Sequence, residues 1–119
     1  MKKQVSEKQI EKKLVDGVKA IGGVAMKFVS PGRDGVSDRI VLMPGGRIWF
    51  VELKKPGGKL SPLQERFGLM VNAMGFQYRV LGSVEAVTAF IEWLKTSGTD
   101  CVKIIPKRFV ESTGVNERE

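Results

Sequence analysis

The feature that most constrains the fold is the segment at residues 38–54, DRIVLMPGGRIWFVELK. Two apolar runs rich in β-branched and aromatic residues flank a Pro-Gly-Gly turn at residues 44–46. Such runs favour strands, and proline with glycine is typical of a tight turn. The segment therefore predicts an antiparallel hairpin with strands at about 38–43 and 47–54. Because the second strand is apolar on both faces, helices should cover both sides of its sheet.

The predicted register gathers three charged residues at the open end of this hairpin. With a three-residue loop Met43 faces Arg47, and counting back along the strands places Asp38 opposite Glu52. Directly opposed side chains share a face at about 5 Å between Cβ atoms, and alternation puts Lys54 on the same face as Glu52. A shift of one residue in the loop would scatter them. Two carboxylates this close repel, and a divalent cation between them removes the repulsion, so the pair is a candidate metal site.

The composition narrows both the partner and the chemistry. The 119 residues carry a formal charge of +7 and include no histidine. A basic chain favours a polyanionic partner, with nucleic acid ahead of an acidic membrane surface. The lack of histidine excludes Ser-His-Asp hydrolysis and histidine metal sites. The remaining ligands are carboxylate and backbone oxygens, which suit Mg²⁺ or Mn²⁺.

The length and the cysteine content predict a single intracellular domain. One cysteine, Cys101, allows no intrachain disulfide and suits a reducing compartment. No run approaches the roughly 20 apolar residues of a membrane span, and the N-terminus lacks the apolar core of a signal peptide. We therefore expect a cytoplasmic protein without membrane association. Its domain should span residues 1–106, followed by a polar, flexible tail at 107–119.

Periodic patterns predict seven elements in the order α-β-β-β-α-β-α. Apolar residues at helical spacing predict the helices, and short β-rich runs between glycine-containing turns predict the strands. This order favours a three-layer α/β domain with a mixed central sheet. The expected elements are a helix at 6–21, strands at 24–29, 38–43 and 47–54, a helix at 62–74, a strand at 76–81 and a helix at 84–96.

Apolar spacing also predicts which large side chains are buried. The apolar stripe of the helix at 62–74 comprises Leu63, Phe67, Met70, Val71 and Met74. Trp49 and Trp93 also occur in apolar patterns, which favours core positions over base-stacking platforms. Residues 101–106, CVKIIP, have the composition of a strand.

These patterns together resemble a known family of nucleases. Asp38, a hairpin and then Glu52-Leu53-Lys54 has the form of the PD-(D/E)xK signature, and the element order is similar to the restriction-endonuclease-like core. The segments SEKQIEKKLVDGVKAIGG and GVSDRIVLMPGGRIWFVELKKPGGKLSPLQ look like the VRR-NUC family, in its compact stand-alone phage and bacterial form. The resemblance covers about residues 6–95.

The resemblance implies a function and assigns roles by position. It implies Mg²⁺- or Mn²⁺-dependent cleavage of DNA phosphodiesters, with one or two cations per site and branched DNA as the substrate. Asp38 and Glu52 match the metal ligands, helped by the Leu53 carbonyl. Lys54 matches the motif lysine, and Gln64 matches the glutamine that follows the motif.

The same resemblance implies a further acidic ligand from the first helix. We prefer Glu11 to Glu7, because Glu11 lies at the edge of the buried face while Glu7 belongs to the first turn, which frays. One position departs from the family pattern. The usual proline before the aspartate is Ser37 here, which leaves the chemistry intact but removes a stiffening residue.

Three basic residues are candidate DNA contacts. Lys55 and Lys59 flank a Gly-Gly turn beside the acidic pair, and Arg33 lies in the polar loop at 30–35. Lysine and arginine at such positions bind phosphates without reading sequence. The bland alternatives are a solvated salt bridge for the charged trio and a plain surface amide for Gln64.

The mode of action leaves alternatives open. The resemblance favours a homodimer that cuts four-way junctions, since two-fold symmetry presents two equivalent sites, with residues 101–110 as the expected interface. A flap or single-strand nuclease, or a basic DNA-binding subunit without catalysis, are the alternatives.

Overall fold

The computed structural model describes residues 4–103, with side chains as far as residue 96. Its seven elements follow the predicted order: α1 (Glu7–Ala20), β1 (Val24–Lys27), β2 (Arg39–Met43), β3 (Arg47–Leu53), α2 (Pro62–Ala73), β4 (Gln77–Leu81) and α3 (Val84–Lys103). The predicted domain boundary at residue 106 and the tail at 107–119 lie outside the described range. Within that range no helix has both the length and the apolar character needed to span a membrane.

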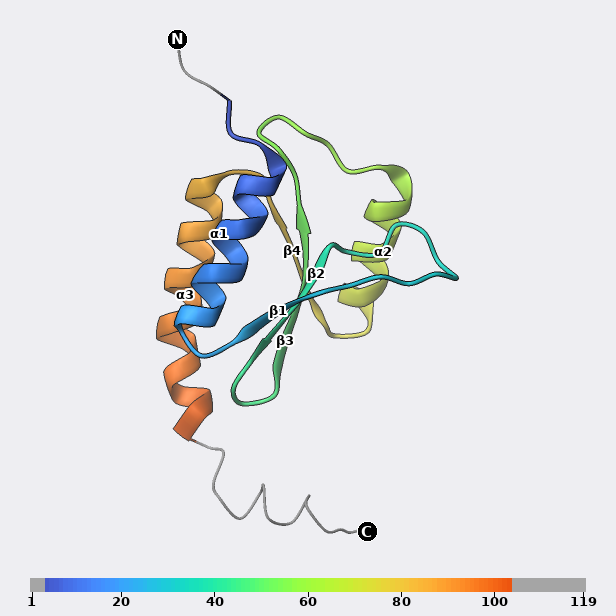
Figure 1. Cartoon of the computed structure of the whole chain (residues 1–119). Helices are drawn as coiled ribbons and strands as arrows, with labels where there is room; N and C mark the ends of the chain where they lie inside the picture. The colour runs from blue at the N-terminus through green and yellow to red at the C-terminus, as the bar shows by residue number, and fades with distance from the viewer. Residues whose placement is uncertain (1–3, 104–119) are drawn as a thin grey trace.

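The strands form one mixed sheet between two helical layers. The strand order is β1-β2-β3-β4, antiparallel except for the parallel pairing of β3 with β4. Helices α1 and α3 lie side by side on one face, and α2 lies on the other (Figure 1). The predicted three-layer α/β architecture is therefore confirmed.

The hairpin has the predicted register. Met43 pairs with Arg47 and Arg39 pairs with Val51, around a turn in which Gly45 and Gly46 both have positive φ. Glycine adopts that backbone conformation without a Cβ clash, which is why the turn needs both residues.

Each face of the sheet has its own apolar layer. The face toward α1 and α3 buries the main core, made by Ile10, Leu14, Val18, Val41, Trp49, Val51, Leu53, Val87, Phe90 and Leu94. The face toward α2 carries an aromatic cluster of Phe28, Phe50, Phe67, Phe76 and Tyr78. A Cβ at Gly68 of α2 would lie 2.6 Å from the Tyr78 ring, so this glycine lets α2 approach β4.

Two predicted boundaries were wrong. Helix α3 continues to Lys103 rather than ending at 96, so Cys101–Lys103 are helical and not strand-like. A glycine such as Gly98 costs a helix only about 1 kcal/mol relative to alanine, which does not end it. Strand β1 ends at Lys27 rather than Val29, although the Phe28 N–H still donates to the Asp38 carbonyl at 3.0 Å.

Three large side chains expected in the core are exposed. In α2, Phe67 and Val71 are buried while Leu63 is 46% exposed, and Met74, the C-cap that follows α2, is 64% exposed. Trp93 of α3 is 43% exposed, whereas Trp49 of β3 is buried. An apolar pattern marks the buried side of a helix but not how far its partner layer extends.

Candidate active site

The hairpin positions the two acidic residues as the sequence predicts. Asp38 directly precedes β2, and continuing the register from the Arg39–Val51 pair places it opposite Glu52 in β3. Arg39 and Val51, the neighbouring pair in the register, face α1 and α3. Because side chains alternate along a strand, Asp38 and Glu52 belong to the opposite face, which α2 covers. The site is thus an end of the hairpin, next to the start of α2.

A backbone hydrogen bond fixes the Asp38 carboxylate. Its Oδ2 accepts from the Leu53 N–H at 2.8 Å. This bond ties the residue before β2 to the last residue of β3. Asp38 therefore has one carboxylate oxygen engaged with the backbone of β3.

Glu52 is the most unusual group in the site, because it is a carboxylate that is only 2% exposed. Its Oε2 accepts from the Gln64 Nε2 at 2.9 Å and lies 3.6 Å from the Lys54 Nζ. Its Oε1 is buried and has no hydrogen-bond partner among residues 4–103. A buried acceptor without a partner is costly, so this oxygen is expected to have a ligand in the working protein.

The orientation of Gln64 follows from the start of α2. The Ser61 N–H donates to the Gln64 Oε1 at 2.8 Å, and the Ser61 Oγ accepts from the Gln64 N–H at 3.2 Å, which is a capping box. Because the amide oxygen is held by the backbone, the amide NH₂ faces Glu52. One side chain thus caps α2 and holds the carboxylate.

Burial and charge shift two pKa values in the site. The pKa of Glu52 is raised from 4.5 to about 7, mainly by burial and then by the nearby Asp38 carboxylate, while Lys54 opposes the shift. The pKa of the Tyr78 phenol is raised to about 12, first by burial and then by Glu52 and Asp38. Burial disfavours the charged form of the Glu52 carboxylate, and a second negative charge beside it adds to this effect.

Tyr78 is the site residue that the sequence did not reveal. Its hydroxyl is buried near both acids and has no hydrogen-bond partner in the described part of the chain. It reaches this place because β4 pairs in parallel with β3, with Tyr78 beside Phe50. A parallel pairing across a helical crossover leaves no local signal, so the sequence offered none for this residue.

The structure does not bring Glu11 to the acidic pair. Its Oε2 pairs with the Arg39 Nε at 2.8 Å, and the same guanidinium donates to the Ala25 carbonyl at 3.0 Å. Arg39 faces α1, on the other side of the sheet from Asp38. Glu7 lies exposed in the first turn of α1. Among the side chains of residues 4–96, no three Asp or Glu residues form a group that could hold a metal, so the role of Glu11 stays a prediction.

Ser37 takes the place of the family proline in a specific way. The residue is 1% exposed, and its Oγ donates to the Arg39 carbonyl at 3.3 Å. This bond restrains the backbone on both sides of Asp38. The Ser37 hydroxyl therefore restrains the backbone next to Asp38, a position where a proline would restrain it through its ring.

The predicted DNA contacts lie on exposed loops. Lys55 and Lys59 are exposed at the two ends of the turn closed by the Gly58 N–H and the Lys55 carbonyl at 2.9 Å. Gly57 adopts a φ of +82° there. Arg33 is exposed in the loop before β2. Lys55 directly follows Lys54, and Lys59 lies four residues further along the same loop after β3.

Comparisons with known proteins identify the family of this chain. The model of the VRR-NUC domain family matches residues 3–85, which is more than half of the chain. The chain belongs to the VRR-NUC family. It is 53% identical over 79 residues to a protein named as nuclease p44 of Acyrthosiphon pisum secondary endosymbiont phage 1, covering 66% of this chain and 85% of that protein.

A solved structure shares the fold of this VRR-NUC chain. It is a VRR-NUC domain with a TM-score of 0.69 and 32% identity, and the likeness covers 74% of this chain and 97% of that one. The predicted family and fold are therefore confirmed, and the chain is a nuclease-family protein. Asp38 and Glu52 lie inside residues 3–85, which the family model matches.

The residues present suit a hard divalent cation. The donors at the site are carboxylate oxygens of Asp38 and Glu52 beside the end of β3, and one of them, the Glu52 Oε1, is buried without a partner. Oxygen donors are the ligands that Mg²⁺ and Mn²⁺ prefer. Asp38, Glu52 and the Leu53 carbonyl are the groups that would hold it.

Proposed function

We propose that this VRR-NUC protein is a metal-dependent DNA endonuclease that acts on branched DNA such as four-way junctions. The observation that carries the proposal is the Glu52 carboxylate, buried against Asp38 with one oxygen unpartnered and its pKa raised to about 7. Burying such a pair destabilises the free protein. A DNA-binding surface would gain nothing from it, because carboxylates repel phosphates.

A bound divalent cation would supply positive charge next to the phosphate and would lower the pKa of a nearby water. The residues of the chain prepare the site for it. The Leu53 N–H holds the Asp38 carboxylate at the end of β3. Gln64 and Lys54 both contact the Glu52 Oε2, which leaves Oε1 as the oxygen directed to a ligand.

Lys54 is suited to stabilise the developing charge on the phosphate. Its ammonium lies 3.6 Å from the Glu52 Oε2 and is partly exposed, so it remains within reach of a substrate. Charge that builds on phosphate oxygens in the transition state is stabilised most by a cation already held in place. Lys55, Lys59 and Arg33 would contact neighbouring phosphates and hold the duplex.

Branched DNA and a homodimer belong together in this proposal. One site cuts one strand per encounter, whereas a four-way junction needs two paired cuts, which a two-fold dimer provides. The expected interface at 101–110 lies mostly outside the described residues, and only Cys101–Lys103 at the end of α3 fall within them. Light scattering at micromolar concentration, with and without junction DNA, tests the dimer, and a monomer under both conditions contradicts it.

The experiment that tests the function is a cleavage assay on a panel of substrates. Purified protein is incubated with linear, flapped and four-way DNA in Mg²⁺, in Mn²⁺ or with EDTA. The proposal predicts metal-dependent cleavage with the four-way junction cut fastest. Cutting of flaps alone would favour a flap nuclease, and tight binding without any cutting would favour a DNA-binding subunit.

A further inference from the structure

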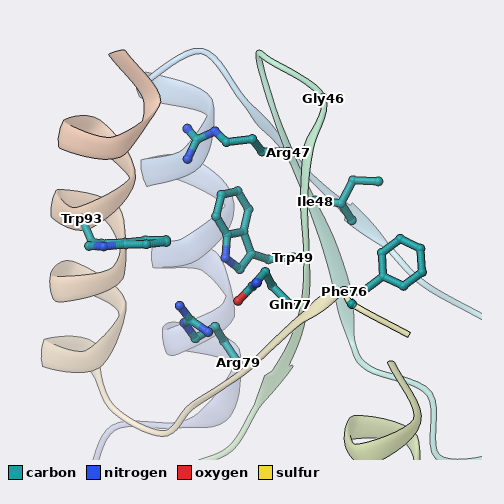
Figure 2. Close-up of a pocket in the computed structure, with 9 residues that line it drawn as sticks. Gly46, Arg47, Ile48, Trp49, Phe76, Gln77, Arg79 and Trp93 are labelled. Atoms are coloured by element: carbon teal, nitrogen blue, oxygen red, sulfur yellow. The ribbon is translucent and has the colours of Figure 1, made fainter. Parts of the chain in front are cut away.

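A cavity lies away from the acidic pair, at the far end of β3. It has a volume of about 520 Å³ and is lined by the β2–β3 turn, the starts of β3 and β4, and α3. Figure 2 shows Arg47, Trp49 and Arg79 extending from the strands and Trp93 extending from α3 toward the same space. These side chains belong to the α3 face of the sheet, whereas Glu52 belongs to the α2 face.

Two guanidinium groups and two indole rings dominate this cavity. The Arg47 guanidinium carbon lies 4.9 Å from the Trp49 ring centre, and that of Arg79 lies 5.3 Å from the Trp93 ring centre. The two indoles meet edge to face at 5.6 Å and 86°. Cations over aromatic faces are attracted to them, so the group forms a preassembled set of positive charge and flat surface.

The polar atoms left without partners in this group are all donors. Among residues 4–103, the Arg47 Nε and Nη2 and the Trp49 Nε1 are buried and make no hydrogen bond. In the described part of the chain, no Asp or Glu lines the cavity. A ligand that satisfies this site must therefore bring acceptors and negative charge.

The exposed indole favours a flat ligand as well as a charged one. Trp93 is 43% exposed, although an indole normally contributes more stability when it is covered. Aromatic side chains beside a cationic groove are the surface on which the bases of single strands stack. An acidic peptide would satisfy the guanidinium groups but would leave the Trp93 ring uncovered, so a nucleotide fits better.

We propose that this cavity binds one nucleotide of a single DNA strand, with its base on Trp93 and its phosphate on Arg47. Four residues of β3 lie between Arg47 and Glu52, which are therefore about 16 Å apart along the strand, and their side chains lie on opposite faces. The cavity therefore holds a strand segment at a distance from the acidic pair. Binding there does not depend on whether the chain cuts DNA.

The chain provides its own reporter for this site. Its two tryptophans, Trp49 and Trp93, both line the cavity, so intrinsic fluorescence reports on the cavity alone. The protein is titrated with a four-nucleotide oligothymidylate in EDTA, and with thymidine 5′-monophosphate and inorganic phosphate as competitors. We expect saturable quenching that thymidine 5′-monophosphate reverses and inorganic phosphate reverses only at far higher concentration.

Variants separate the cavity from general charge. Arg47→Gln and Trp93→Leu should each weaken oligothymidylate binding by about tenfold or more, with Trp49 as the reporter in the second. Arg66→Gln removes the same charge from the exposed side of α2 and should bind like the wild type. Circular dichroism confirms that each variant is folded, and Arg79→Gln replaces Arg47→Gln if that chain fails to fold.

Several results would overturn the proposal. The first is an absence of saturable quenching in the wild type, and the second is wild-type affinity in the folded arginine and Trp93 variants. The third is competition by inorganic phosphate that equals competition by the nucleotide. The fourth is tighter binding of a glutamate tetrapeptide than of the oligothymidylate. Because no metal is present and no bond is cut, these results leave the proposed nuclease activity untouched. Loss of cleavage in the metal assay would likewise leave this site untouched.

Discussion

At the scale of single residues, Glu52 links stability to pH. Its folded pKa of about 7 lies above the ordinary 4.5, so between these values the folded chain binds more protons than the unfolded chain. Stability must therefore fall as pH rises through this window, by up to about 3 kcal/mol once Glu52 is ionised. A bound cation would relieve this cost, since it neutralises the buried pair.

The first prediction follows for the metal-free protein. In EDTA, Glu52→Gln should raise the melting temperature at pH 8, where the wild-type carboxylate is charged, and change it little at pH 5. Differential scanning calorimetry measures both. Glu85→Gln, at the exposed start of α3, is the control and should show no such pH dependence. An equal change in melting temperature at both pH values would show that the pKa of Glu52 is not raised.

The second prediction concerns the Tyr78 hydroxyl. Since it is buried without a partner, removing it in Tyr78→Phe should leave the free energy of unfolding unchanged or raise it by up to about 1 kcal/mol. Urea unfolding of the metal-free chain gives this value. A loss of more than about 1 kcal/mol would mean that the hydroxyl has a stabilising partner.

At the scale of elements, the two capping boxes differ in what they hold. Ser6 with Gln9 starts α1 and Ser61 with Gln64 starts α2, with equal distances of 2.8 and 3.2 Å in each box. Only Gln64 also donates to a carboxylate of the site. The start of α2 is therefore both a structural and a functional element, and the start of α1 serves as its matched control.

The third prediction uses this pair. Ser6→Ala and Ser61→Ala should each cost about 1 kcal/mol of stability through the lost cap. Only Ser61→Ala should lower the cleavage rate, because losing the bond from the Gln64 N–H to the Ser61 Oγ loosens the first turn of α2, which carries the amide that donates to Glu52. Chemical unfolding and cleavage rates are measured side by side. Equal rates for the two variants would remove the start of α2 from the site.

At the scale of the whole molecule, local signals were readable from the sequence and distant ones were not. The pairing of Asp38 with Glu52 depends on a three-residue turn, so it could be counted along the chain. The contact of Gln64 with Glu52 depends on where α2 docks, and the placement of Tyr78 depends on a parallel pairing. The exposure of Trp93 depends on α3 passing the edge of its partner layer.

The fourth prediction concerns the net charge of +7. If phosphates lie along the loop after β3, replacing Lys55 and Lys59 by alanine should lower the salt slope of DNA binding by about one unit per lost contact. Alanine at Lys8 and Lys19, exposed on α1, removes the same charge and should leave the slope nearly unchanged. Equal slopes for both double variants would place the DNA elsewhere.

The central claim is that the Asp38–Glu52 pair carries out metal-dependent cleavage, and one measurement tests it most directly. Single-turnover cleavage of four-way DNA in Mg²⁺ is compared for the wild type, Asp38→Asn, Glu52→Gln and Asp34→Asn, an exposed acid in the preceding loop. All four should bind the DNA equally in Ca²⁺. We predict that Asp38→Asn and Glu52→Gln each lower the rate by about a hundredfold or more while Asp34→Asn cuts like the wild type. A wild-type rate in either of the first two variants would contradict the account.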